Sequence, residues 1–340
     1  MNPIPSSSSL NGVHSTSVNG SAPPIEAVMT PSSVYENGNQ SSSRSEFMDG
    51  FLLDNHNAEI VNHLYHAGFE TSNYADTVLL VQHRDTHQIP HHLHAIILSR
   101  APFLAHLMST CPQGNGQRVI YVHLEREPEV TPEGFRIALG YLYSSASLRL
   151  IHENNCRSVL ASAQLLGGME ELCTYSYDAC RRSISVDTIG EWLEFIDTLP
   201  SPSDGTSTPD LTWTSIFGPY AQRMRDDVFH FLIVTLPQSL DVQWSQPDSS
   251  SPKSGVNGRE LLLQIFSRVP FDLFKTAMES PAFEIGPDQV RFKFAKDVID
   301  MRKRGIARGA EETVVLSNFG GSAVHITRKM RKRPLWKVNS

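Results

Sequence analysis

Histidines are the first residues of this sequence whose type and spacing could support chemistry. Five of them fall within twelve residues, at positions 83, 87, 91, 92 and 94. Imidazole nitrogens bind Zn²⁺, and bound Zn²⁺ activates water, so the cluster could serve a metal-dependent hydrolase. On an extended segment His92 and His94 would share one face, while His91 would point to the other. Zinc normally takes four ligands, and no cysteine or carboxylate cluster lies nearby in the sequence. We therefore expect structural histidines at the edge of a core, and keep a hydrolase that uses the His83–His94 cluster as the less favoured alternative.

Other catalytic patterns are absent from the sequence. It contains no G-x-S-x-G, no H-E-x-x-H, no phosphate-binding loop that ends in Gly-Lys-Ser/Thr, and no G-x-G-x-x-G after a strand. We therefore predict that the protein is not an enzyme, with no catalytic residue, no metal and no cofactor.

The composition is that of a globular protein diluted by irregular segments. The chain has 340 residues, 40% of them hydrophobic, and no run of eighteen apolar residues that would predict a membrane span. Its four cysteines form no C-x-x-C pair, which favours a reduced compartment, the nucleus or the cytoplasm. Residues 1–50 are rich in Ser, Pro and Gly, and we expect a disordered tail there because such residues bury too little apolar area to offset the entropy of ordering.

Between residues 55 and 183 the hydrophobic pattern alternates between strand and helix periods. A helix is predicted over 57–68, with Ile60, Leu64 and Tyr65 on one face and Gly68 at its end. The predicted elements that follow are strands at 77–81 and up to Leu93, short helices at 95–100 and from Pro102, a strand at 118–124, and helices at 131–144, 153–168 and 169–184.

This order, with the residues in it, resembles a BTB/POZ domain of the fungal type. The first strand follows Asp76 in Tyr74-Ala75-Asp76-Thr77-Val78-Leu79, and the helix pair carries a His-x-x-x-Leu-Ser-like signature. The positions that carry the resemblance are Asp76, His94, Leu98, Ser99 and Phe103. The resemblance implies an α+β fold over 55–183, in which a small sheet of three or more strands is flanked by a cluster of helices.

The second half of the chain is predicted to be mainly helical. Residues 184–304 carry amphipathic helices that resemble the BACK extension of BTB proteins, interrupted by loops at about 200–210 and 245–258 that we expect to be disordered. Residues 305–340 predict a β-hairpin around Phe319-Gly320-Gly321 and a basic tail. The basic tail consists of Arg328, Lys329, Arg331, Lys332 and Arg333. We interpret it either as a nuclear-import signal or phosphate-contacting arm, or as a solvated end of the chain.

The resemblance implies a protein–protein interaction module that forms homodimers. Apolar side chains in excess of what a thin sheet needs are consistent with such an interface. The predicted interface residues are Ile60, Leu64, Tyr65, Ile97, Phe103 and Leu107. Such a dimer would act as a scaffold or adaptor for a client protein. An adaptor for a cullin-type ubiquitin ligase is the alternative, although the segment after Leu107 lacks the acidic residue that cullin binding commonly uses. Direct sequence-specific DNA binding is not expected, because no base-reading module is present.

Overall fold

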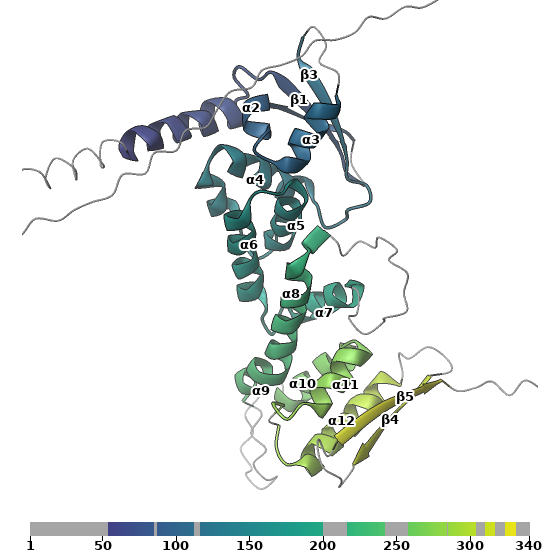
Figure 1. Ribbon diagram of the computed structural model, residues 1–340. Helices are drawn as coiled ribbons and strands as arrows, with labels where there is room; N and C mark the ends of the chain where they lie inside the picture. The colour runs from purple at the N-terminus through teal and green to yellow at the C-terminus, as the bar shows by residue number, and fades with distance from the viewer. Residues whose placement is uncertain are drawn as a thin grey trace, which may run out of the picture. The chain divides into compact units, whose positions relative to one another are not determined.

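Three strands form a sheet in the order β2-β1-β3, with β1 (Thr77–Gln82) in the middle. β2 (Ile89–Leu93) pairs with β1 antiparallel, and β3 (Arg118–His123) pairs with it parallel (Figure 1). Side chains alternate between two faces of a strand, and Leu79, Val81 and Ile120 on one face are fully buried. The order of strands and helices in this region is as predicted.

The computed structural model describes residues 54–84, 87–111, 116–199, 216–241, 258–283, 285–303, 310–316 and 324–330. The predicted tail at 1–50, the loops at 200–210 and 245–257, and the basic residues Arg331, Lys332 and Arg333 lie outside the described residues.

Helices pack against the buried face of the sheet. α2 (Ala95–Leu98) and α3 (Pro102–Thr110) connect β2 to β3, and α4 (Pro132–Tyr143), α5 (Cys156–Leu166) and α6 (Glu170–Ser183) follow, with the 3-10 segment η2 (Ser145–Leu150) between α4 and α5. Pro132 lies in the first turn of α4, and the Thr131 hydroxyl accepts a hydrogen bond from the Gly134 N–H at 3.2 Å. Gly134 lets α4 and α5 approach closely, because a Cβ there would lie 2.0 Å from Ser158 Oγ.

Two predicted helix ends were wrong. The first of the paired helices ends at Leu98 rather than Arg100. The helix before the sheet covers 54–63 and continues as the π-helical segment η1 (Leu64–Glu70), so Gly68 lies inside it rather than at its end. The wider π turn keeps the chain helical past Gly68, and the backbone N–H of Thr71 still bonds to His66 O.

The predicted helices after residue 183 are present. They are α7 (Ile189–Thr198), α8 (Pro219–His230), the π segment η4 (Phe231–Thr235), α9 (Leu236–Ser239), α10 (Gly258–Arg268), α11 (Phe271–Glu279) and α12 (Asp288–Arg302). Pro270 separates α10 from α11, as its missing N–H and fixed φ require. None of the described helices is long and apolar enough to cross a membrane.

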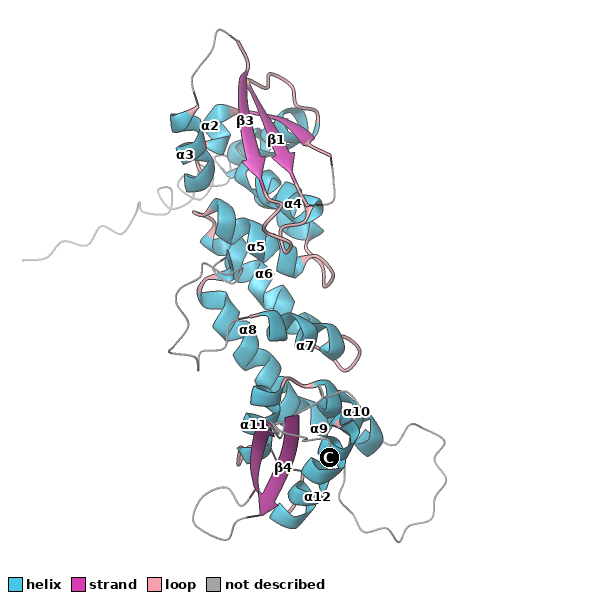
Figure 2. Ribbon diagram, turned by 90° about the vertical axis from the view of Figure 1, so that its right-hand side faces the viewer, coloured by secondary structure: helices cyan, strands magenta, loops and turns pink. Residues whose placement is uncertain are grey.

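The predicted hairpin is also present and packs on this helical part. β4 (Ala310–Leu316) and β5 (Val324–Met330) pair antiparallel, and β5 contacts α11 while β4 contacts α12 (Figure 2). The carboxylate of Glu312 is fully buried between two arginines, 2.9 Å from Arg302 Nε and 2.6 Å from an Arg328 guanidinium nitrogen. A buried carboxylate needs such partners to offset its desolvation.

Arg328 therefore does not belong to a free basic tail. Its guanidinium pairs with Glu312 and lies 4.1 Å from the centre of the Phe271 ring, which makes it part of the packing between hairpin and helix. Lys329 is exposed. Helices and small sheets in separate segments give the described chain an α+β fold, as predicted.

Candidate functional site

The helix that covers 54–70 is anchored at one end only. Tyr65 and Phe69 are buried, and the Phe69 ring lies 5.3 Å from the ring of Tyr143 in α4. By contrast, every residue from 54 to 64 is exposed, and this part of the helix projects from the sheet and helices that follow it (Figure 1). The large apolar residues of the exposed part are Ile60, Val61 and Leu64, which fall within a 100° arc of the helix. We call these three residues the ridge.

His94 holds the turn that follows this helix. Its Nε2 lies 2.8 Å from the carbonyl oxygen of Asn73, and its Nδ1 and backbone nitrogen each lie 3.0 Å from the Tyr143 hydroxyl. A carbonyl only accepts, so Nε2 carries the proton and donates it, while Nδ1 accepts from the Tyr143 O–H. The Tyr143 oxygen in turn accepts from the His94 backbone N–H. All polar groups of His94 are thus engaged in structure.

Asp76 fixes the same junction from the other side. Its Oδ1 accepts hydrogen bonds from the backbone N–H of Ala95 at 2.8 Å and from the Thr77 hydroxyl at 2.9 Å. It thereby satisfies a free N–H in the first turn of α2, as a capping carboxylate does. Of the other signature positions, Leu98 is fully buried, and the Ser99 hydroxyl donates to Ile96 O at 2.8 Å.

The histidine cluster does not converge on one point. His83 is buried with its Nδ1 3.1 Å from Val130 O, His94 is engaged as above, and His92 is exposed. Among the residues that the structure describes, no group of three or more His, Cys, Asp or Glu side chains is placed to hold a metal ion.

The predicted interface residues differ in how far their side chains are exposed. Ile60 is 45% exposed and Leu64 36% exposed, so both remain accessible. Tyr65 is buried and packs on the core because it lies on the inward side of the helix, so it is not part of the exposed apolar surface that Ile60 and Leu64 form. Ile97, Phe103 and Leu107 are half-buried and pack on the core of the same chain. Several exposed apolar residues were not predicted, among them Val61 in the ridge and Ile96 in α2, which is 77% exposed.

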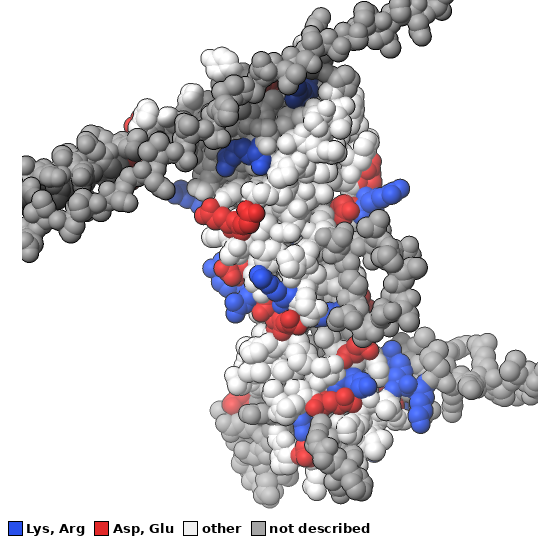
Figure 3. Space-filling model, viewed as in Figure 1, with Lys and Arg blue, Asp and Glu red and all other residues white. Residues whose placement is uncertain are grey.

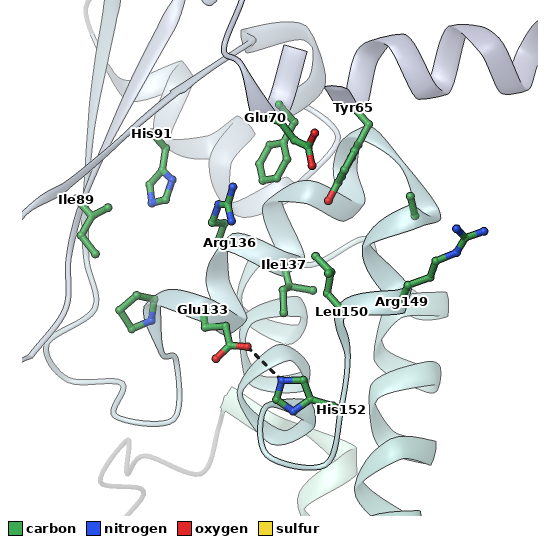
Figure 4. Close-up of a pocket in the computed structure, with 13 residues that line it drawn as sticks. Tyr65, Glu70, Ile89, His91, Glu133, Arg136, Ile137, Arg149, Leu150 and His152 are labelled. Carbon is green, nitrogen blue, oxygen red and sulfur yellow. Dashed lines mark ion pairs between the residues drawn. The ribbon is translucent and has the colours of Figure 1, made fainter. Parts of the chain in front are cut away.

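A groove of about 870 Å³ opens beside the anchored end of the helix (Figure 4). It is bounded by η1, β2, the first half of α4 and the segment 146–152. Its apolar lining is formed by Tyr65, Phe69, Ile89, Pro132, Ile137, Ala146 and Leu150. Because four separate segments supply these side chains, no single stretch of sequence indicates the groove.

The charged groups of the groove are unequally paired. Glu133 lies 3.4 Å from His152 and accepts a hydrogen bond from Asn155 at 2.7 Å, and Glu70 lies 2.7 Å from His66. Arg136 and Arg149 form no ion pair or hydrogen bond with any residue in the described part of the chain.

Arg136 is the more central of these two arginines. Its guanidinium lies 5.7 Å from the Phe69 ring and, in Figure 4, between His91 on one side and Tyr65 and Leu150 on the other. Arg149 lies at the rim and points away from the apolar lining. The groove therefore combines an apolar lining with two arginines that form no ion pair in the described part of the chain and with two carboxylates, Glu70 and Glu133, that pair with histidines, so that Arg136 is free to bind an acidic group of an apolar ligand.

His91 adds no charge to the groove at neutral pH. Burial, together with the nearby charges of Arg136, His83 and His92, lowers the pKa of His91 to about 4.

Basic side chains do not gather into a continuous field on the face drawn in Figure 3, where Lys and Arg are interspersed with Asp and Glu. Such a mixture does not provide the single-sign surface that phosphate backbones require. No protein-family model matches the sequence, and no curated protein matches it.

The pKa of His91 predicts an acid-sensitive contribution to stability. The pKa in the folded chain, about 4, is below the ordinary value of 6.5, so the unfolded chain takes up the proton first as the pH falls. The contribution is complete above pH 6.5 and is lost between pH 6.5 and 4. His91→Gln should therefore reduce the difference in unfolding free energy between pH 7.5 and 4.5 by about 1–3 kcal/mol, as measured by urea unfolding. If the unfolding free energy of the variant falls between pH 7.5 and 4.5 by as much as that of the parent, this assignment is contradicted.

Proposed function

We propose that this protein is a BTB-like interaction module that forms a homodimer through the ridge and acts as a scaffold or adaptor without catalysis. The order of strands and helices over 55–183 supports the BTB-like assignment, as do the structural roles of Asp76 and His94 at the junction that carries the resemblance. The observation that carries the proposal is the exposed, apolar first part of the helix 54–70.

The exposed part of this helix needs a partner surface. Isolated helices shorter than about 12–15 residues are marginal in water, and most helical stability comes from packing of an apolar face. Residues 54–64 have no such packing, although they present Ile60, Val61 and Leu64 on one side. A second copy of the same helix provides an apolar face of matching size, and a two-fold axis makes this contact self-complementary and closed.

A two-fold contact through the ridge also brings the groove into the interface. If the two helices cross antiparallel, so that Ile60 meets Leu64 of the second copy, then Asp54 of the second copy lies opposite Glu70. The segment just before residue 54 of the second copy is thereby delivered to the groove. The ridge alone is small compared with the roughly 800 Å² per partner of a stable interface, so the groove supplies area that the dimer needs.

The sequence before residue 54 fits the groove chemically. Residues 46–53 read Glu-Phe-Met-Asp-Gly-Phe-Leu-Leu, with large apolar side chains for the lining and two carboxylates for Arg136. In the antiparallel arrangement proposed here, the segment binds between copies rather than within one chain.

The ridge is tested by the double variant Ile60→Asp, Leu64→Asp. Two carboxylates would have to be buried without partners in the dimer, so the variant should be a folded monomer by light scattering while the parent is a dimer. The matched control is Asn55→Asp, Asn62→Asp, which adds the same charge on the opposite face of the helix and should remain dimeric. A folded double ridge variant with the mass of the parent would refute the interface.

The groove is tested by charge reversal. Arg136→Glu should raise the dimer dissociation constant about tenfold or more, because a charge-assisted contact becomes repulsive. The reversal Glu46→Lys, Asp49→Lys should weaken the dimer similarly and should restore association when combined with Arg136→Glu. Arg126→Glu, an exposed arginine outside the groove, serves as the control. Equal effects of the two arginine variants, with no recovery in the combined variant, would show that the segment does not bind there.

A further inference from the structure

The outer edge of β3 carries backbone groups that no other described residue binds. β3 forms one edge of the sheet, with β1 on its inner side (Figure 2). The backbone N–H groups of Arg118, at the start of the strand, and of Leu124, just after its end, donate to carbonyl oxygens of the β1 segment at 3.0 Å and 2.8 Å. The even-numbered residues of the strand therefore direct their backbone groups to β1. The N–H and C=O groups of Val119, Tyr121 and His123 point the other way, to the free edge.

The side chains at these outward positions are apolar for the most part and are exposed. Val119 is 42% exposed and Tyr121 is 55% exposed, and in the strand register they lie beside Val78 and Leu80 of β1. Natural proteins commonly protect a sheet edge with proline, charged side chains or a bulge. β2, at the opposite edge of this sheet, contains Pro90. The outward positions of β3 carry no proline, lysine, arginine or carboxylate, so this edge is open to pairing.

We propose that β3 pairs antiparallel with β3 of a second copy and joins the two sheets edge to edge. A two-fold axis at Tyr121 sets this residue opposite its own copy, and sets Val119 opposite His123. All three outward residues then face outward residues, and each such pair exchanges two backbone hydrogen bonds. A shift by one residue would set outward groups against inward ones, and a shift by two would leave one end unpaired. The strand is thus complementary to itself in one register.

Charge also favours a second copy of this chain in the antiparallel direction. Arg118 begins β3, and Glu125 follows its end. Antiparallel pairing brings Arg118 of each copy next to Glu125 of the other, whereas parallel pairing would place like charges together. Arg118 forms no ion pair with any described residue, and Glu125 lies 3.3 Å from His123 on its own chain. At the axis, the two Tyr121 side chains form a cross-strand aromatic pair, which stabilises antiparallel strands.

The free edge of β3 is a different surface from the ridge, and its pairing does not depend on the dimer proposed above. A contact along one short strand is small compared with the roughly 800 Å² per partner of a stable interface, so we expect it to form only at higher concentration. A chain that has both self-complementary surfaces then assembles beyond two copies as its concentration rises.

The edge is tested in the full-length Ile60→Asp, Leu64→Asp variant, which lacks the ridge. Its mass by sedimentation should rise from one chain at micromolar concentration toward two chains near millimolar concentration, and no further. Hydrogen exchange resolved to single amides should show that Val119, Tyr121 and His123 exchange at least about tenfold more slowly at the higher concentration. The amides between them should be protected at both concentrations, because they bond to β1.

Charge variants in the same background test the register. Tyr121→Lys sets two ammonium groups face to face at the axis and should raise the dissociation constant about tenfold or more. His92→Lys adds the same charge to the same face of the sheet, on β2 at the opposite edge, and should change nothing. Arg118→Glu and Glu125→Arg should each weaken pairing alone, and a mixture of these two variants should pair again, because each supplies the charge that the other lacks.

Circular dichroism establishes that each variant is folded before it is measured. A mass that stays at one chain at every concentration, with fast exchange of Val119, Tyr121 and His123 throughout, would overturn the proposal. So would equal effects of Tyr121→Lys and His92→Lys, or a mixture of the two charge variants that does not pair. Failure of the ridge is a separate result, since the parent and the ridge variant would then have the same mass at micromolar concentration.

Discussion

A short helix in water is not stable without a surface to pack against, and the proposed self-association follows from this constraint. The helix 54–70 satisfies it at one end, where Tyr65 and Phe69 enter the core, and leaves it unsatisfied over residues 54–64. The ridge is therefore more than a set of incidental surface residues, because the element that carries it requires a covering. In the proposed homodimer a second copy would provide that covering with no further protein, and the antiparallel arrangement would direct the segment 46–53 to the groove.

The polar groups that hold the anchored end of the helix in place include a histidine that the sequence alone offers as a metal ligand. Both ring nitrogens of His94 form hydrogen bonds, to Tyr143 and Asn73, and Asp76 caps α2. These contacts fix the turn between the helix and β1, and so fix the direction in which the exposed part of the helix projects. The groove depends on the same contacts, because Tyr65 and Phe69 form one of its walls. Structure, rather than catalysis, accounts for the most chemically suggestive residues.

The sequence predicted the elements well because their patterns are local. Alternation placed the strands, and Pro102 and Pro132 marked helix starts that the structure has. Side-chain direction was harder. Tyr65 follows Leu64 by one residue, which is enough on a helix to turn it from the exposed side to the core. Arg328 adjoins a run of basic residues, yet its place on β5 directs it to the buried Glu312. The groove could not be predicted, since its walls come from segments as distant as Tyr65 and His152.

Hydrogen exchange of the amides in residues 54–64 tests the central claim most directly, because an uncovered helix opens readily and a covered one does not. The account predicts that these amides are protected in the full chain at concentrations where it is dimeric. Their protection should decrease on dilution, and it should be lost in the Ile60→Asp, Leu64→Asp variant while the amides of α4 and α5 stay protected. Fast exchange of residues 54–64 at every concentration, or protection that neither dilution nor the ridge variant changes, would contradict it.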